Sequence, residues 1–123
     1  MSTKLKKGGA DLRRDMVLDA AEDYVDLAWY VYEVRKALGT ADEHEIMSET
    51  ADAIRDLLSA GYIRAGYLTG EGFEVWPDSP ASARDRILAE CSDMGRLPEM
   101  WEVAWFAATS KGEEYAERAA SEN

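Results

Sequence analysis

The chain has 123 residues, of which 46% are hydrophobic and 32% charged, and it contains a single cysteine. This composition favours one folded domain over a disordered chain, and a single cysteine excludes an internal disulfide. The single cysteine favours a reducing, cytoplasmic setting. No apolar stretch is long enough to cross a membrane, and no apolar segment follows the basic start of the chain, so we expect neither a membrane span nor a secretory signal.

The net charge of −11 is unevenly distributed along the chain. Residues 1–14 carry +4, whereas the remaining residues carry −15. A body this acidic repels nucleic acid and anionic membranes and attracts basic surfaces. The alternative is that the acidity only keeps the protein soluble.

The first predicted element is a long helix. Residues 1–10 are expected to form a flexible basic tail, and the hydrophobic periodicity then predicts one helix over residues 11–38, which ends at Gly39. The apolar arc of this helix covers more than half of its circumference, and Tyr30 falls on the narrow acidic remainder. Such a helix is either central to the core or shared with a second subunit. A homodimer seam would use Leu18, Val25, Trp29 and Tyr32.

A second helix is predicted to begin at Thr40, whose spacing to Glu43 is that of a capping box, and to end at Gly61. Its apolar periodicity is unbroken, so the sequence leaves two alternatives for residues 41–60, one helix or two. The opposite face carries four carboxylates within an arc of about 60°. These four residues, named the acidic ridge below, are Glu45, Glu49, Asp52 and Asp56.

Two aromatic and β-branched runs then predict a β-hairpin. The strands cover residues 62–68 and 73–76 and flank the turn Thr69-Gly70-Glu71-Gly72. A third helix is predicted to begin with Ser79 as N-cap and Pro80 in the first helical position, and to end near Met94.

The last two predicted elements are a strand and a helix. Alternation of large apolar residues predicts a strand over residues 101–107, and a capping box of Ser110 and Glu113 predicts a final helix to about residue 120. The order α-α-β-β-α-β-α predicts one small α+β domain over residues 11–120, with a three-stranded antiparallel sheet. Residues 121–123 are expected to fray.

Several segments resemble known families. The stretch "IRDLLSAGYIRAGYLTGEGFEVW" resembles the recognition helix and wing of winged helix-turn-helix proteins, and "WFAATSKGEEYAERA" resembles the strand-to-helix step that often closes such domains. The stretches "GFEVWPDSPASARDRILAE" and "EVAWFAATSKGEEYA" resemble a pattern in small uncharacterised actinobacterial proteins. These resemblances imply a winged-helix-like fold rather than a particular activity.

The sequence contains no recognisable motif for catalysis or cofactor binding. Cys91 lies on the predicted apolar face of its helix, so we expect a buried, inert thiol, and a pairing with His44 would need two different elements to meet. In residues 42–45, Asp-Glu-His-Glu, the single histidine is flanked by adjacent acids, whereas metal ligands on one helical face need a spacing of three or four residues. We therefore expect no enzymatic activity, no cofactor and no metal.

The acidic ridge bears most directly on function. Glu45–Glu49 and Asp52–Asp56 are like-charge pairs four residues apart, each of which costs a helix about 0.2–0.5 kcal/mol. A basic partner would offset this repulsion, whereas DNA, which is bound largely through its phosphates, would add to it. We therefore expect a protein-binding domain, such as a regulatory adaptor, an antitoxin or immunity-type inhibitor, or an acidic DNA mimic.

The alternative is a winged-helix DNA-binding transcriptional regulator. Its phosphate contacts would be Lys6, Lys7, Arg13, Arg14 and Arg64.

Overall fold

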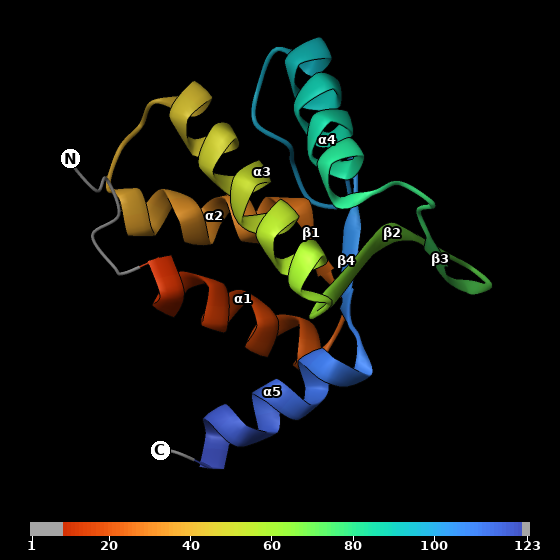
Figure 1. The fold of residues 1–123 in the computed structure, drawn as a ribbon. Helices are drawn as coiled ribbons and strands as arrows, with labels where there is room; N and C mark the ends of the chain where they lie inside the picture. The colour runs from red at the N-terminus through yellow and green to blue at the C-terminus, as the bar shows by residue number, and fades with distance from the viewer. Residues whose placement is uncertain (1–8, 122–123) are drawn as a thin grey trace.

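The structure is a computed structural model that describes residues 9–121. Predictions for the basic tail before residue 9, including Lys6 and Lys7, and for residues 122–123 lie outside this range. The elements, in chain order, are α1 (Gly9–Glu22), β1 (Val25–Asp26), α2 (Leu27–Leu38), α3 (Glu43–Ala60), β2 (Ile63–Thr69), β3 (Gly72–Val75), α4 (Pro80–Met94), β4 (Trp105–Ala108) and α5 (Ser110–Ser121) (Figure 1). The fold is mixed α+β, as predicted.

The sheet has four antiparallel strands rather than the predicted three, in the order β1-β4-β2-β3. Phe106 of β4 pairs with Val25 on one side and with Ala65 on the other. Paired residues direct their side chains to the same face, and all three are buried, so this face of the sheet lies on the core. Thr69 pairs with Gly72 at the hairpin turn, as predicted.

The predicted helix over residues 11–38 is wrong, because the chain leaves helical geometry between α1 and α2. The intervening β1 pairs with β4, and the carboxylate of Asp26 accepts a hydrogen bond from the Trp29 backbone N–H at 3.1 Å as the N-cap of α2. A continuous helix of this length would extend about 42 Å, further than a small domain is wide. The break allows both halves to pack on one core.

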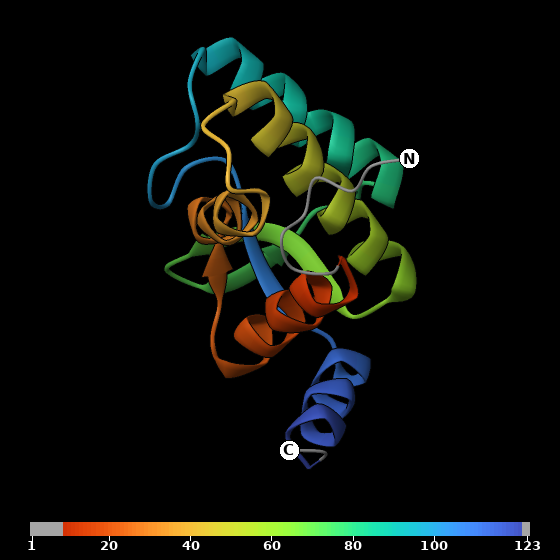
Figure 2. The ribbon, with the colours of Figure 1, turned by 90° about the vertical axis from the view of Figure 1, so that its left-hand side faces the viewer.

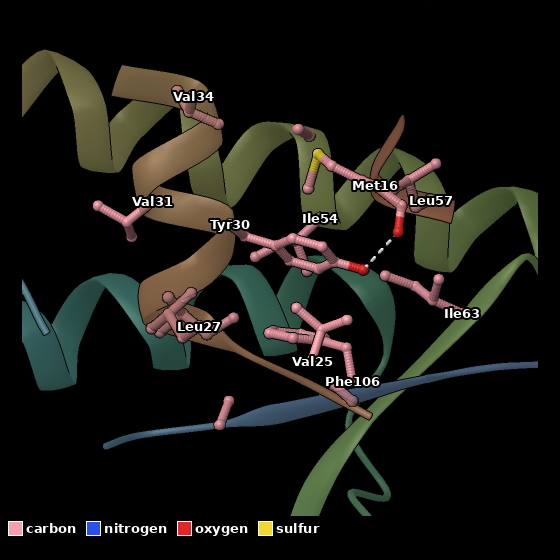
Figure 3. Packing of buried hydrophobic residues seen from close by; sticks show 14 of the residues in the cluster. Met16, Val25, Leu27, Tyr30, Val31, Val34, Ile54, Leu57, Ile63 and Phe106 are labelled. Carbon is pink, nitrogen blue, oxygen red and sulfur yellow. Dashed lines mark hydrogen bonds between the residues drawn. The ribbon is translucent and has the colours of Figure 1, made fainter. Parts of the chain in front are cut away.

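The break also changes which side of α2 is buried. Tyr30, which the sequence placed among the acidic residues, is fully buried, and its hydroxyl donates a hydrogen bond to the Met16 carbonyl at 2.9 Å (Figure 3). Its ring centre lies 5.0 Å from that of Phe106. Burial, reinforced by the negative charges of Asp19 and Glu33, raises the pKa of Tyr30 well above its ordinary value. Tyr30 is therefore a core residue that α1, α2 and β4 share.

The segment predicted as one helix or two is the single helix α3. Its N-cap is Asp42 rather than Thr40, because the Asp42 carboxylate accepts a hydrogen bond from the Glu45 N–H at 3.2 Å. The helix ends at Gly61, as predicted, with Gly61 in the left-handed conformation at φ 81°. In two perpendicular views α4 lies alongside α3 (Figures 1 and 2).

The elements after the hairpin are partly as predicted. Ser79 and Pro80 begin α4, and Gly95 ends it. The last strand begins only at Trp105, so the prediction of a strand from residue 101 is wrong for its first four residues. The N-cap of α5 is Thr109 instead of Ser110, because the Thr109 hydroxyl accepts a hydrogen bond from the N–H of the third residue beyond it at 3.0 Å. No helix within residues 9–121 is both long and apolar enough to span a membrane.

Candidate functional site

The acidic ridge lies on the outer side of α3, between α1 and α4, and its residues are partly buried. Asp52 accepts a hydrogen bond from Arg84 of α4 at 2.7 Å, and Asp56 accepts one from Arg13 of α1 at 2.7 Å. Arg55 lies 3.6 Å from Asp52 and 3.2 Å from Asp56. The C-terminal half of the ridge is therefore neutralised by three arginines of the same chain.

The pKa of Asp56 reflects this pairing. Partial burial acts to raise it, but hydrogen bonds from Arg13 and Arg55 bring the pKa below its ordinary value. The like-charge repulsion between Asp52 and Asp56 is thus offset within the molecule, so this pair does not require a basic partner. The other two carboxylates of the ridge, Glu45 and Glu49, lie toward the start of α3.

The residues named for phosphate contact are spread over different elements. Arg13 is held against Asp56, and Arg14 is exposed on α1 with its guanidinium 3.8 Å from the Asp15 carboxylate. Arg64 is exposed on β2, where its guanidinium carbon lies 5.7 Å from the ring centre of Phe73. Arg13 is therefore committed to an internal ion pair.

The proposed homodimer seam does not form one stripe, because its residues belong to different elements. Leu18 is partly buried on α1, and Val25 is 6% exposed in β1. Trp29 and Tyr32 are both 48% exposed on α2, with their ring centres 5.4 Å apart. The indole N–H of Trp29 also donates a hydrogen bond to Asp19 at 3.1 Å. What remains of the seam is an exposed aromatic pair.

A feature that the sequence prediction missed is the loop of residues 95–104, named the Trp101 loop below. Arg96 and Glu102 form two parallel hydrogen bonds across it, at 2.7 and 2.9 Å. The Glu99 backbone N–H donates to the same Glu102 carboxylate at 2.8 Å. The Arg96 guanidinium and the Glu99 N–H together lower the pKa of Glu102 to about 2. Two-point pairing of this kind fixes geometry as well as charge, so the loop is braced from within.

The Trp101 loop presents two large apolar side chains to solvent. Met100 is 67% exposed and Trp101 is 72% exposed, the two largest values among the large hydrophobic residues that the structure describes as exposed. The Trp101 backbone N–H donates a hydrogen bond to the second carboxylate oxygen of Asp26 at 2.9 Å, so one side chain caps α2 and anchors the loop.

The backbone of this loop is strained. Trp101 and Val103 have φ of 71° and 72°, and they are the two non-glycine residues with positive φ within residues 9–121. Such a conformation costs about 1–3 kcal/mol, and it persists where the surrounding structure enforces it, often at functional sites. An exposed tryptophan held in a strained, anchored loop has no role in the core, which makes it the leading candidate for a contact residue.

A pocket of about 210 Å³ lies beside Trp101. Its lining comes from β2, α4, the Trp101 loop and β4, and consists of Tyr67, Leu68, Glu90, Trp101, Val103, Ala104 and Trp105. The lining thus contains three aromatic side chains, Tyr67, Trp101 and Trp105, and one carboxylate, that of Glu90. Such a lining suits the binding of another molecule more than covalent chemistry.

A second, larger groove of about 560 Å³ runs between the start of α3 and the end of α4. Both His44 of α3 and Cys91 of α4 line this groove. Cys91 is 5% exposed, and burial, reinforced by Glu90 and Glu102, raises the pKa of its thiol to about 11. The thiolate required for nucleophilic chemistry is therefore disfavoured near neutral pH.

Among residues 9–121 no three His, Cys, Asp or Glu side chains group in a way that could hold a metal ion. The sequence offered one signal for the Trp101 loop that the strand prediction overlooked. Leu97-Pro98-Glu99-Met100 separates Gly95 from the following aromatic residues, and such an interruption is typical of a loop.

Comparison of the chain with protein-family models, with curated proteins and with solved structures found no match in any of the three.

Proposed function

We propose that this chain is a protein-binding domain without enzymatic activity and that the Trp101 loop is its principal contact. The observation that carries the proposal is Trp101 itself, which is 72% exposed while its backbone is anchored by Asp26 and braced by the Arg96–Glu102 pair. Tryptophan and methionine are enriched in protein interfaces, and tryptophan is prominent among the residues that dominate binding energy. A loop ordered before binding loses little conformational entropy in the complex.

The acidity of the molecule has a supporting role in this proposal. Three arginines partly neutralise the acidic ridge, so we assign it long-range attraction rather than a tight local contact. Complementary charge raises the rate of association more than the affinity. A regulatory adaptor, an antitoxin or immunity-type inhibitor, and an acidic DNA mimic would each present such a surface to a basic partner.

The winged-helix interpretation is part of the proposal. The order of α3 followed by the β2–β3 hairpin is that of a recognition helix and its wing, which favours the DNA-binding alternative. Two observations favour protein instead: α4 lies along α3, and the outer side of α3 carries the acidic ridge. The hairpin turn contains Glu71 and no basic residue.

The proposal is tested by affinity capture from cells of the source organism, with quantitative mass spectrometry of the captured proteins. We expect wild-type protein to enrich a partner that Trp101→Ala fails to enrich. The matched control is Val75→Ala, which truncates another exposed apolar side chain, 49% exposed on β3. Thermal unfolding of each variant checks that it is folded. Equal enrichment by wild type and Trp101→Ala would contradict the proposed contact.

Two further arms separate the alternatives. Glu49→Lys reverses a ridge carboxylate, and we expect it to slow association while leaving the captured partner the same. In an electrophoretic mobility shift assay at low salt with mixed genomic fragments, we expect no change in the mobility of the DNA. A shift that declines steeply with salt would favour the DNA-binding regulator over the protein-binding domain.

A further inference from the structure

The pocket beside Trp101 is assembled from three parts of the chain that are distant in sequence. Tyr67 comes from β2, Glu90 from α4, and Trp101 and Trp105 from the continuous segment formed by the Trp101 loop and the start of β4. Its volume of about 210 Å³ is suited to one side chain rather than to a cofactor. Both strained residues of the loop, Trp101 and Val103, line it, so the strain shapes this pocket.

The lining is suited to a cation. The faces of tryptophan and tyrosine rings attract ammonium and guanidinium groups, and a nearby carboxylate adds a charge-assisted hydrogen bond. The Glu90 side chain is 41% exposed, and its hydrogen bond with Arg86 is long, at 3.4 Å, so it can accept a second donor.

The same side of the molecule already contains a pairing of this kind. The guanidinium carbon of Arg86 lies 3.9 Å from the ring centre of Trp76, and its Nη2 donates to the Tyr67 hydroxyl at 2.6 Å. Arg86 also pairs with Asp78 at 3.2 Å. Arg86 thus lies against Tyr67, at 5.5 Å from its ring centre, and bonds to one oxygen of Glu90, so an incoming cation would use the Trp101 and Trp105 rings and the other Glu90 oxygen.

We propose that the pocket receives a lysine or arginine side chain of the protein partner, an inference that rests on the proposed protein-binding function. The basic side chain lies against Trp101 and Trp105, and its charged end bonds to Glu90. Charge complementarity supports this occupant, since residues 15–123 carry −15 and attract basic segments before contact. Exposed Trp101 and Met100 then contact the partner around the inserted side chain.

The test uses two small probes of the same shape, N-acetyl-arginine amide and the uncharged N-acetyl-citrulline amide. The chain has four tryptophans, whose indole N–H signals are assigned in NMR spectra by single Trp→Phe variants. We expect the arginine probe to shift the Trp101 and Trp105 signals saturably. The citrulline probe should bind more weakly by at least about threefold, because it lacks the cation.

Glu90→Gln keeps the shape of the side chain and removes its charge, so it should weaken binding of the arginine probe by a similar factor. The matched control is Glu114→Gln, which removes one exposed carboxylate on α5 that does not line the pocket and should leave binding unchanged. Equal binding of the two probes, an unchanged affinity in Glu90→Gln, or an equal shift of the Trp29 signal would each overturn the inference.

These outcomes are distinct from those that test the proposed function. If Trp101→Ala loses the captured partner while Glu90→Gln retains it at the wild-type level, protein binding stands and the basic side chain is excluded. If the partner is retained by Trp101→Ala, the proposed function itself fails.

Discussion

At the scale of single residues, Asp26 and Glu102 determine how Trp101 is presented. The two oxygens of Asp26 accept from the backbone N–H groups of Trp29 and Trp101, at 3.1 and 2.9 Å. Glu102 accepts from Arg96 and from the Glu99 N–H. The contact of Asp26 with Trp101 is not visible in the sequence, because the two residues lie 75 positions apart.

The pairing of Glu102 predicts a pH dependence of the loop. The pKa of Glu102 is lowered from its ordinary 4.5 to about 2, so the stabilisation is complete above about pH 4.5 and is lost as the pH falls toward about 2. In Arg96→Met the titration midpoint of Glu102, measured by carboxyl carbon NMR, should return toward the ordinary value. Arg84→Met, which removes an arginine paired elsewhere, should leave it near about 2. An unchanged midpoint in Arg96→Met would show that the pair does not form.

At the scale of elements, the sequence predicted those whose signals are local. The hairpin, the start of α4 at Ser79 and the ends of helices at Gly39, Gly61 and Gly95 all agree with the structure. Each depends on cap or turn residues within a few positions. The break between α1 and α2 was missed because the apolar residues of the two helices happen to continue one periodic arc.

The other element missed was β1, whose two residues are strand only through pairing with β4. A two-residue strand has no periodicity of its own, so no sequence pattern could predict it. The Trp101 loop was mistaken for strand because Trp101, Val103 and Trp105 alternate, although positive φ at the first two excludes extended geometry. Because residues 101–104 were predicted as strand, the sequence did not indicate the Trp101 loop as a candidate site.

Two helix caps provide a matched comparison at this scale. Asp26 and Asp42 both cap a helix, but only Asp26 also holds Trp101. Asp26→Ala and Asp42→Ala should each lower the free energy of unfolding by about 1 kcal/mol, measured in urea. Only Asp26→Ala should increase the mobility of the Trp101 amide, measured by its ¹⁵N relaxation. Equal mobility in the two variants would mean that Asp26 does not anchor the loop.

At the scale of the whole molecule, the described fold combines an internally compensated acidic helix with an exposed, braced aromatic loop. The acidic ridge, which the sequence made the leading candidate site, is neutralised in part by Arg13, Arg55 and Arg84 from three helices. The pairs of Asp56 with Arg13 and of Asp52 with Arg84 join different helices and cannot be read from helical spacing, whereas Arg55 is three residues from Asp52 on the same helix. The sequence therefore predicted the sign of the molecule's charge and its fold class. It did not predict that the most exposed large apolar side chains, Met100 and Trp101, lie in the Trp101 loop.

The central claim is that a protein partner contacts Trp101, and photo-crosslinking tests it most directly. Benzoylphenylalanine is placed at position 101, and at exposed Ser82 of α4 as control, in protein expressed in its native cells. We expect a covalent adduct of larger mass from position 101 and none from position 82. No adduct from position 101, or the same adducts from both positions, would contradict it.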